Sequence, residues 1–174
     1  MLNSDVGQLL VVCAAPGTGK SALLPELVEA ARPMVVVDLD ELPDDGRILG
    51  VPVSGPAGEL NWAAYEALWF KILDFITRAG HTALILSQIP ALDRSLPTHT
   101  PPGTPITWYL LDCPDEVRSG RLKGRGWSDD RIAEATQAAE SARAAIPASI
   151  MVGPDEEPAQ VAQRVLHTMT NPPG

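Results

Sequence analysis

The sequence predicts an α/β fold in which a parallel sheet of five strands carries helices on both faces. Short apolar runs alternate along the chain with longer segments whose apolar residues recur at helical intervals. The first run, Leu9–Ala14, is apolar throughout and rich in valine, which is typical of a strand buried on both faces of a parallel sheet. The length of 174 residues is that of one domain, so we expect residues 1–174 to form a single domain.

Each short apolar run predicts one strand. Two stretches rich in proline or glycine, Pro43–Gly58 and Pro90–Pro105, fit no regular element and are predicted as loops. The predicted strands are Leu9–Ala14, Met34–Val37, Thr82–Leu86, Ile106–Leu111 and Ser149–Val152.

The helices are predicted by apolar residues spaced three and four positions apart, and by proline or glycine at the helix ends. In the longest helix, Trp62, Tyr65 and Trp69 form one such stripe. These rings could stack on an aromatic substrate, but packing of the helix on the sheet is the favoured interpretation. The predicted helices are Ser21–Ala31, Leu60–Ala79, Pro114–Leu122, Ser128–Ala145 and Pro158–Met169.

The charge balance narrows the range of partners. With 22 acidic and 13 basic side chains, the formal net charge is −9, and such a field repels nucleic acid polymers and anionic membranes. It still allows a local cationic pocket for a small phosphate. Two cysteines, Cys13 and Cys113, are expected to be free thiols. Because the start of the chain has no basic leader and no apolar run is long enough to span a bilayer, we expect a cytoplasmic protein.

The turn between the first strand and the first helix reads Ala14-Ala15-Pro16-Gly17-Thr18-Gly19-Lys20-Ser21. It resembles the Walker A loop, GxxxxGK[ST], with alanine in place of the first glycine. Glycines let the backbone turn its N–H groups inward around an anion, and the helix N-terminus that follows adds partial positive charge. Lys20 would then reach the β- and γ-phosphates of a nucleotide, and the Ser21 hydroxyl would ligate Mg²⁺.

Two aspartates, Asp38 and Asp40, stand at the carboxyl end of the second strand. Ligands bind at that edge of an open parallel sheet. Residues two apart on a strand point the same way, so both carboxylates are expected to face one site. Two neighbouring carboxylates repel each other unless a cation or a proton transfer uses them. We expect Asp38 to hold Mg²⁺ and Asp40 to accept a proton from a substrate hydroxyl; Asp40 as a second metal ligand, or both as solvated surface charge, are the alternatives.

Five of the 13 basic residues fall in one short segment, in which Gly124 and Gly126 flank an arginine and allow a hinged loop. Phosphoryl transfer needs cations around the transferred group, although the same residues could also form a solvated helix balanced by nearby carboxylates. Arg131, at the end of this segment, and the later Arg143 could grip an anionic acceptor or form surface ion pairs. The five basic residues are Arg118, Arg121, Lys123, Arg125 and Arg131.

Together, these features resemble the small P-loop kinases: a phosphate loop, a DxD sequence after the next strand, a long loop and a basic segment. Shikimate kinase and gluconate kinase are nearest in pattern, and chloramphenicol phosphotransferase and the nucleoside monophosphate kinases are wider relatives. The resemblance covers most of the chain in element order. It is specific at Gly17–Ser21, at Asp38 and Asp40, and in the basic segment, but not in the substrate loop, so it does not identify the acceptor.

The resemblance implies a P-loop NTPase fold with strand order 2-3-1-4-5 and an arginine-bearing lid over residues of about 118–130. Arg121 and Arg125 match the spacing of the arginines that bracket the nucleotide phosphates in such lids, and the first of them also stacks on adenine. Ser87 stands where many nucleotide kinases have a metal-binding carboxylate. The metal would therefore fall to Asp38, together with the loop serine.

The resemblance also implies ATP and Mg²⁺ as cofactors and assigns residues to them. Residues expected to contact the nucleotide are Pro16, Gly17, Thr18, Gly19, Lys20, Ser21, Arg121 and Arg125. Catalysis is expected from Lys20, Asp40 and Arg125, the metal from Ser21 and Asp38, and acceptor contacts from Asp40 and Arg47.

The function expected from these features is transfer of the γ-phosphoryl group of ATP to a hydroxyl of a small molecule. A nucleoside monophosphate kinase is one alternative, and there the acceptor is already an anion that needs no base. An antibiotic-modifying phosphotransferase is another. A nucleotide-binding protein without turnover is a third, for which Ala14 and Ser87 argue. The expected partner is a small-molecule or nucleotide acceptor, and the sequence does not indicate an oligomeric state.

Overall fold

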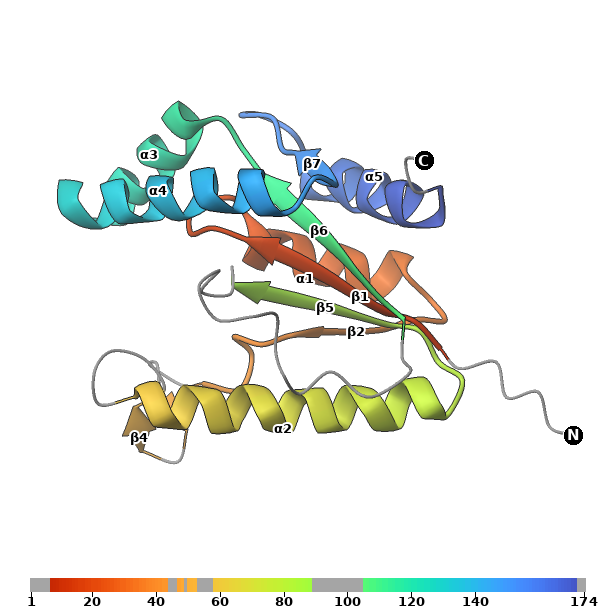
Figure 1. Ribbon diagram of the computed structural model, residues 1–174. Coiled ribbons are helices and arrows are strands. Elements are labelled where there is room, and N and C mark those ends of the chain that lie inside the picture. Colours follow the sequence, from red (N-terminus) through yellow and green to blue (C-terminus); the bar gives the residue numbers. More distant parts are fainter. Residues whose placement is uncertain (1–6, 44–46, 49, 53–57, 89–104, 172–174) are drawn as a thin grey trace, which may run out of the picture.

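A parallel sheet forms the centre of the molecule. The structure is a computed structural model that describes residues 7–43, 47–48, 50–52, 58–88 and 105–171. The strands of the sheet are β1 (Leu9–Ala14), β2 (Val35–Asp38), β5 (Ala83–Gln88), β6 (Ile106–Asp112) and β7 (Ser149–Met151). They lie in the order β2-β5-β1-β6-β7, and neighbouring strands are parallel (Figure 1). Counted along the chain within this sheet, that is the order 2-3-1-4-5, so the predicted fold class is confirmed.

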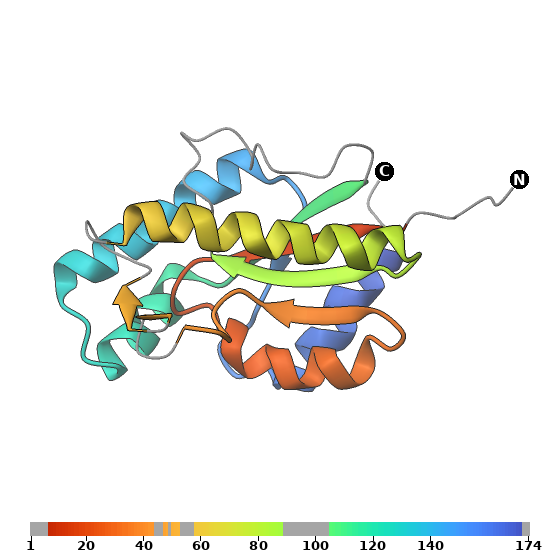
Figure 2. The same cartoon turned by 90° about the horizontal axis from the view of Figure 1, so that it is seen from below.

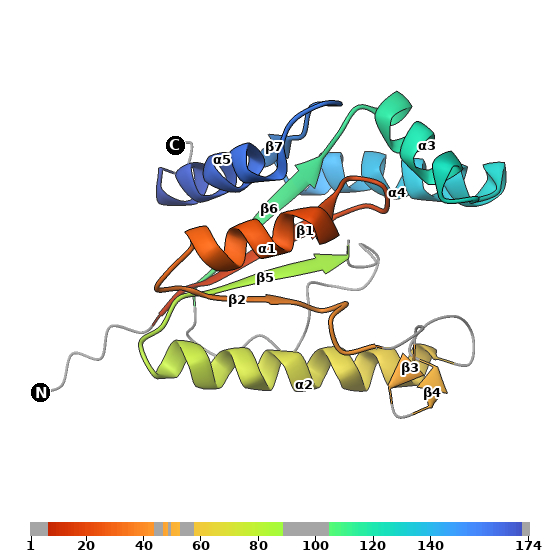
Figure 3. The ribbon, with the colours of Figure 1, turned by 180° about the vertical axis from the view of Figure 1, so that it is seen from behind.

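Helices cover both faces of the sheet. They are α1 (Lys20–Ala30), α2 (Glu59–Arg78), α3 (Asp115–Gly124), α4 (Asp129–Ala145) and α5 (Pro158–Thr170). Seen from behind, α1 and α5 lie in front of the sheet, whereas α2 and α4 lie on its other side (Figure 3). α3 lies beyond the carboxyl ends of the strands, next to α4 (Figure 1).

Alternate side chains of β1 enter two separate cores, which explains why the whole strand is apolar. Leu10 and Val12 pack in the core that α1 and α5 close, together with Leu23. Leu9 and Val11 pack in the core that α2 and α4 close. Because both faces of the strand are covered, no position of the run can be polar without burying an unpaired group.

The aromatic stripe of α2 packs against the sheet, as the favoured interpretation holds. Tyr65 and Trp69 are buried in the second core, and Trp62 is half-buried against it. The Trp62 and Tyr65 ring centroids lie 5.6 Å apart, and those of Tyr65 and Trp69 lie 6.4 Å apart. These are ordinary separations for packed aromatic pairs.

The loop predicted over Pro43–Gly58 contains a small hairpin, so the expectation of no regular element there is wrong. β3 (Arg47–Ile48) pairs antiparallel with β4 (Val51–Pro52) around Gly50, which has a φ of 80°. Strands of two residues are too short to show an alternating pattern in sequence. The hairpin lies beside the first turns of α2 (Figures 2 and 3), where the Asn61 amide donates to the Pro52 carbonyl at 3.1 Å. The other predicted loop, Pro90–Pro105, lies outside the described residues except for its last residue.

Candidate active site

The loop between β1 and α1 has a shape suited to an anion. Gly17 and Gly19 have positive φ angles of 85° and 112°, a backbone region that glycine enters without steric cost. The Thr18 hydroxyl donates to the Ala15 carbonyl at 2.8 Å and closes the turn. α1 begins at Lys20, and the N–H groups in the first turn of a helix have no partner within the helix. Loop and helix start together form the donor set that a phosphate needs.

Close packing as well as backbone angle requires glycine in this loop. A Cβ added at Gly17 would lie 3.0 Å from the Leu122 side chain and 3.1 Å from Arg118 Cγ, both on α3. The helix therefore lies directly against the loop. Ala14, which stands in place of the first glycine of the Walker pattern, is buried at the end of β1 and is in register with strands on both sides. Its methyl group fits within the sheet.

Lys20 joins the loop to the two aspartates that follow β2. Its Nζ lies 2.5 Å from Asp38 Oδ1 and 2.6 Å from Asp40 Oδ2. The Asp38 side chain is 4% exposed and that of Asp40 is 41% exposed. The structure thus brings together three residues that sequence reasoning assigned to one site, with one carboxylate enclosed and the other open to solvent.

The two carboxylates meet for a different reason from the predicted alternation along a strand. β2 ends at Asp38, and Asp40 lies in the turn that follows. The Asp40 N–H donates to Asp38 Oδ1 at 3.0 Å, a local turn that aspartate favours. Gln88, at the end of β5, donates to Asp40 Oδ1 at 3.2 Å. Sequence reasoning missed this glutamine, although its place at the carboxyl end of a predicted strand was a signal for it.

Tyr65 of α2 forms a hydrogen bond to the segment that carries the two aspartates. Its hydroxyl donates to the carbonyl oxygen of Leu39, the residue between the two aspartates. The Leu39 N–H in turn donates to the Leu86 carbonyl of β5 at 3.0 Å. Burial raises the pKa of the Tyr65 phenol above its ordinary value of 10.0, so the hydroxyl keeps its proton and remains a donor at neutral pH.

Arg121 lies on the other side of the loop, where a cavity of about 460 Å³ opens. It donates to the Thr18 carbonyl at 2.8 Å and to the Gly17 carbonyl at 3.4 Å, and also to Pro154 at 3.4 Å. Arg121 and Arg125 both line the cavity, together with Gly19 and residues of α1 and α5. The volume suits a small organic ligand. The two arginines that sequence reasoning paired therefore border one space beside the phosphate loop.

The glycine predicted as a hinge closes the end of α3. Gly126 has a φ of 77° and donates to the Lys123 carbonyl at 2.9 Å, while Trp127 N–H donates to the Leu122 carbonyl at 3.1 Å. This pair of bonds is the Schellman arrangement, in which glycine takes the left-handed position after a helix. Trp127 packs against the cluster around Leu122, and Ser128 begins α4 by accepting from the Arg131 N–H.

A second cavity, of about 300 Å³, lies on the side of the loop that faces Gln88. Pro16, Gln88, Trp127, Arg131 and Glu134 line it. The Arg131 guanidinium carbon lies 3.9 Å from the centroid of the Trp127 ring, a cation–π contact. Gln88, which lines this cavity, also donates to Asp40 and so links the cavity to the carboxylates.

Three other arginines have contacts or burial that the sequence did not predict. Arg47 lies exposed in the small hairpin and donates to Gly50 within it at 3.0 Å. Arg143 forms ion pairs with Asp112 and Asp115 at 2.5 and 2.7 Å. This is the ion-pair alternative, except that the Asp112 partner is buried rather than at the surface. Arg118, counted with the basic lid segment, has a fully buried side chain.

The donor set fits a magnesium ion that is shared with a bound phosphate. Among the described residues, no three His, Cys, Asp or Glu side chains lie close enough together to hold a metal ion on their own. Ser21 stands exposed in the first turn of α1, beside Lys20. Mg²⁺ commonly takes one or two protein oxygens and completes its shell with phosphate oxygens and water, so the Ser21 hydroxyl and the Asp38 carboxylate suffice as protein ligands.

Fold and site together define an α/β protein with a phosphate loop at the carboxyl edge of its sheet, and solved structures share this fold. A sugar kinase from a Janibacter species has a TM-score of 0.65 at 18% identity, with 96% of each chain covered. Shikimate kinase from Acinetobacter baumannii, in complex with shikimate, has a TM-score of 0.65 at 13% identity over 95% of this chain and 94% of that one. A gluconokinase from Sinorhizobium meliloti has a TM-score of 0.58 at 16% identity over 95% and 93%.

The chain therefore has the fold of the small P-loop kinases, as its motifs predict. No protein-family model matches the chain, and no curated protein matches its sequence. Within the described residues, no helix is both long and apolar enough to cross a membrane.

Proposed function

We propose that this protein is an ATP- and Mg²⁺-dependent phosphotransferase that moves the γ-phosphoryl group to a hydroxyl of a small molecule. The observation that carries the proposal is the meeting of Lys20 with Asp38 and Asp40, at 2.5 and 2.6 Å, beside the phosphate loop. A phosphate-binding cation and a solvent-accessible carboxylate at one point are two of the groups that take part in phosphoryl transfer to a hydroxyl.

The loop, Arg121 of α3 and Arg125, which directly follows α3, support the nucleotide half of the proposal. The amides of residues 17–21 and the Lys20 ammonium bind phosphate oxygens and neutralise their charge. Arg121 and Arg125 border the cavity of about 460 Å³ that would receive the nucleoside. Bound Mg²⁺, held by Ser21 and Asp38, would supply further positive charge to the phosphates.

Asp40 supports the acceptor half. Its carboxylate is 41% exposed, in contrast to that of Asp38, and so an acceptor can reach it. Gln88 and the turn that Tyr65 holds fix its position. As a base, Asp40 would take the proton of the acceptor hydroxyl, and the cavity of about 300 Å³ beside Gln88 would hold the rest of the acceptor. Arg47 remains a proposed acceptor contact from its hairpin.

The solved relatives support the class of reaction but leave the acceptor open. They are a sugar kinase, a shikimate kinase in complex with shikimate, and a gluconokinase. The net charge of −9 supports an acceptor that is neither a nucleic acid polymer nor part of an anionic membrane. The two free cysteines support a cytoplasmic location for the protein.

A coupled assay of ADP release tests the proposal. ATP and Mg²⁺ are supplied with a panel of sugars, hydroxy acids, aminocyclitols and nucleoside monophosphates. We expect one class of hydroxyl acceptor to stimulate ADP release in the parent and in Lys71→Ala, a control at an exposed lysine of α2, but not in Lys20→Ala. Stimulation only by nucleoside monophosphates would identify a nucleotide kinase, and ATP binding without any turnover would identify a nucleotide-binding protein.

A further inference from the structure

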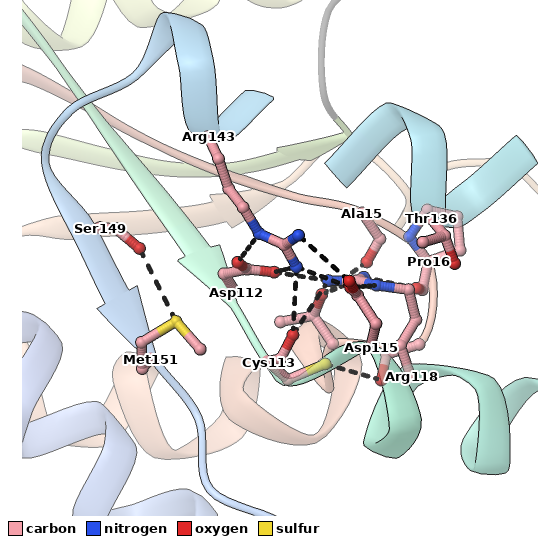
Figure 4. A network of polar contacts seen from close by, with 12 residues as sticks. Ala15, Pro16, Asp112, Cys113, Asp115, Arg118, Thr136, Arg143, Ser149 and Met151 are labelled. Atoms are coloured by element: carbon pink, nitrogen blue, oxygen red, sulfur yellow. Dashed lines mark hydrogen bonds and ion pairs between the residues drawn. The ribbon is translucent and has the colours of Figure 1, made fainter. Parts of the chain in front are cut away.

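Arg118 lies at the centre of a network of four charged side chains, of which Arg118 and Asp112 are buried and Arg143 and Asp115 are partly exposed (Figure 4). Its own side chain has no exposed surface, and Asp112 is 2% exposed. Arg118 Nη2 lies 2.5 Å from Asp112 Oδ1, and Arg143 Nε lies 2.5 Å from Asp112 Oδ2. Arg143 also pairs with Asp115 at 2.7 Å. Two arginines and two aspartates therefore balance one another in charge where β6 ends and α3 begins.

The same guanidinium also reaches the phosphate loop, more than 90 residues away in the sequence. Arg118 Nη1 donates to the Pro16 carbonyl and to the Thr18 hydroxyl, both at 3.0 Å. These two residues flank Gly17, whose Cβ position is blocked by Arg118 itself at 3.1 Å. One side chain thus connects the carboxyl end of β6 to the middle of the loop.

These contacts set the direction of the loop amides. In a trans peptide, the C=O and the following N–H point in opposite directions. Because the Pro16 carbonyl points at Arg118, the N–H of Gly17 points away from it. The Thr18 carbonyl accepts from Arg121, so the N–H of Gly19 points away from that arginine in the same manner. The two arginines of α3 hold the carbonyls on one side of the loop and so direct the amides to the other.

A buried arginine is a costly way to fill space, because burial removes the charge from water and an apolar side chain of similar size is often no less stable. What an arginine adds is a rigid planar fork that fixes several acceptors at once. The fork of Arg118 serves Asp112 on one nitrogen and the phosphate loop on the other. The geometry accordingly favours a role in shaping the loop over a role in filling the core.

We propose that Arg118 is a positioning residue that holds the phosphate loop, through Pro16 and Thr18, in the shape that binds the nucleotide phosphates. It acts through the loop backbone and does not itself touch the nucleotide. The proposal rests on the proposed function in one respect, namely that the loop binds ATP.

The network supplies a matched pair of charge-balanced variants for the test. Arg118→Met with Asp112→Asn removes the arginine that contacts the loop and leaves the Arg143–Asp115 pair. Arg143→Met with Asp115→Asn removes the other arginine and leaves the Arg118–Asp112 pair. The Arg143 contacts are with Asp112, Asp115 and the Cys113 carbonyl. Asp115 also lies 3.7 Å from Arg118 Nε, so the second variant disturbs the same network, including one contact of Arg118, without losing a loop contact.

Two measurements are made on each variant and on the parent: amide hydrogen exchange over residues 15–21 without nucleotide, and the Kd for ATP with Mg²⁺ by calorimetry. In the Arg118 variant we expect faster exchange in the loop and a Kd weakened roughly 10- to 100-fold, since bonds from a charged donor are lost. In the Arg143 variant we expect both to match the parent, whatever happens to the unfolding midpoint. Equal effects in the two variants, or no effect in the Arg118 variant, would overturn the proposal.

Two further outcomes are distinguishable. If the Arg118 double variant does not fold, Arg118→Lys takes its place, because lysine keeps a cation for Asp112 but lacks the planar fork. We expect Arg118→Lys to fold and still to show faster amide exchange in the loop. Loop exchange as slow as in the parent would overturn the proposal. If the parent itself does not bind ATP, the proposed function fails, while the loop exchange measured without nucleotide still decides the role of Arg118.

Discussion

The two sides of Lys20, which we propose to be the nucleotide side and the acceptor side of the site, are built in different ways. On the nucleotide side, α3 lies directly on the phosphate loop, and its arginines bond to backbone carbonyls of that loop. On the acceptor side, the contacts are between side chains of elements that are far apart in the sequence. Asp40 follows β2 and contacts Gln88 at the end of β5, and residues of α4 line the second cavity. A phosphate is bound mainly by backbone geometry, which a short motif can encode, whereas an acceptor is recognised by side chains that the fold brings together.

The largest expected effect lies on the acceptor side, at Asp40. If the acceptor is a neutral hydroxyl, Asp40→Asn keeps the shape and removes the base. We expect the chemical step to slow by roughly 100- to 10,000-fold, the usual contribution of general acid–base catalysis, with little change in ATP affinity. Single-turnover kinetics and calorimetry measure the two quantities separately.

Asp38→Asn is the matched control for Asp40, because both carboxylates contact the same ammonium. We expect it to raise the Mg²⁺ concentration needed for activity. A near-normal Asp40→Asn enzyme would exclude the hydroxyl acceptor and favour a nucleoside monophosphate, since a phosphate oxygen is already ionised. Equal losses in both variants that excess Mg²⁺ restores would mean that both carboxylates serve the metal.

Lys20 belongs to both sides, so its loss should affect both binding and turnover. We expect Lys20→Ala to weaken ATP binding and to lower turnover by roughly 100- to 1000-fold, the effect of removing one charge-stabilising donor. Calorimetry with ATP and Mg²⁺ gives the first value and the ADP-release assay the second. Parent-like values in both measurements would show that the loop is not a nucleotide site.

The proposed lid should divide at the end of α3 rather than move as one segment over residues 118–130. Up to Leu122, α3 is held to the phosphate loop by Arg118 and Arg121. At ADP or ATP concentrations of 100 times Kd, we expect amide exchange in residues 123–128 to slow about 100-fold if these residues close over the nucleotide. Residues 115–122 should be protected already without nucleotide. Equal protection of both parts in both states would argue against a lid.

The smallest effect on turnover is expected at Tyr65, which contacts the backbone between the two aspartates. Tyr65→Phe keeps the packed ring but leaves the buried Leu39 carbonyl without its donor, at a cost of about 1–2 kcal/mol. We expect a lower unfolding midpoint and a turnover reduced only several-fold, because the Lys20 contacts of the two aspartates remain. A loss of turnover as large as that of Asp40→Asn would mean that the tyrosine, not the lysine, sets the position of the carboxylates.

The sequence predicted the sheet and the glycine loop between β1 and α1 because each depends on local patterns. The apolar run Leu9–Ala14 is β1 to the residue. Gly17, Thr18 and Gly19 form the predicted turn, and α1 begins at Lys20. Patterns within the sequence could not reveal the burial of Arg118, because its partners are a loop about 100 residues earlier and an aspartate that the strand pattern leaves unassigned. The hairpin at Arg47 was missed for a different reason, since two residues per strand carry no period.

Because the two aspartates are unequally exposed, only one of the two ion pairs of Lys20 should be sensitive to ionic strength. Dissolved salt screens charges that water can reach and affects enclosed pairs much less. Raising the salt concentration should therefore weaken the bond to Asp40, whose side chain is 41% exposed, and leave the bond to Asp38, at 4%, almost unchanged. In a saline solution the ammonium stays with the enclosed carboxylate, and Asp40 is the one released to the solvent.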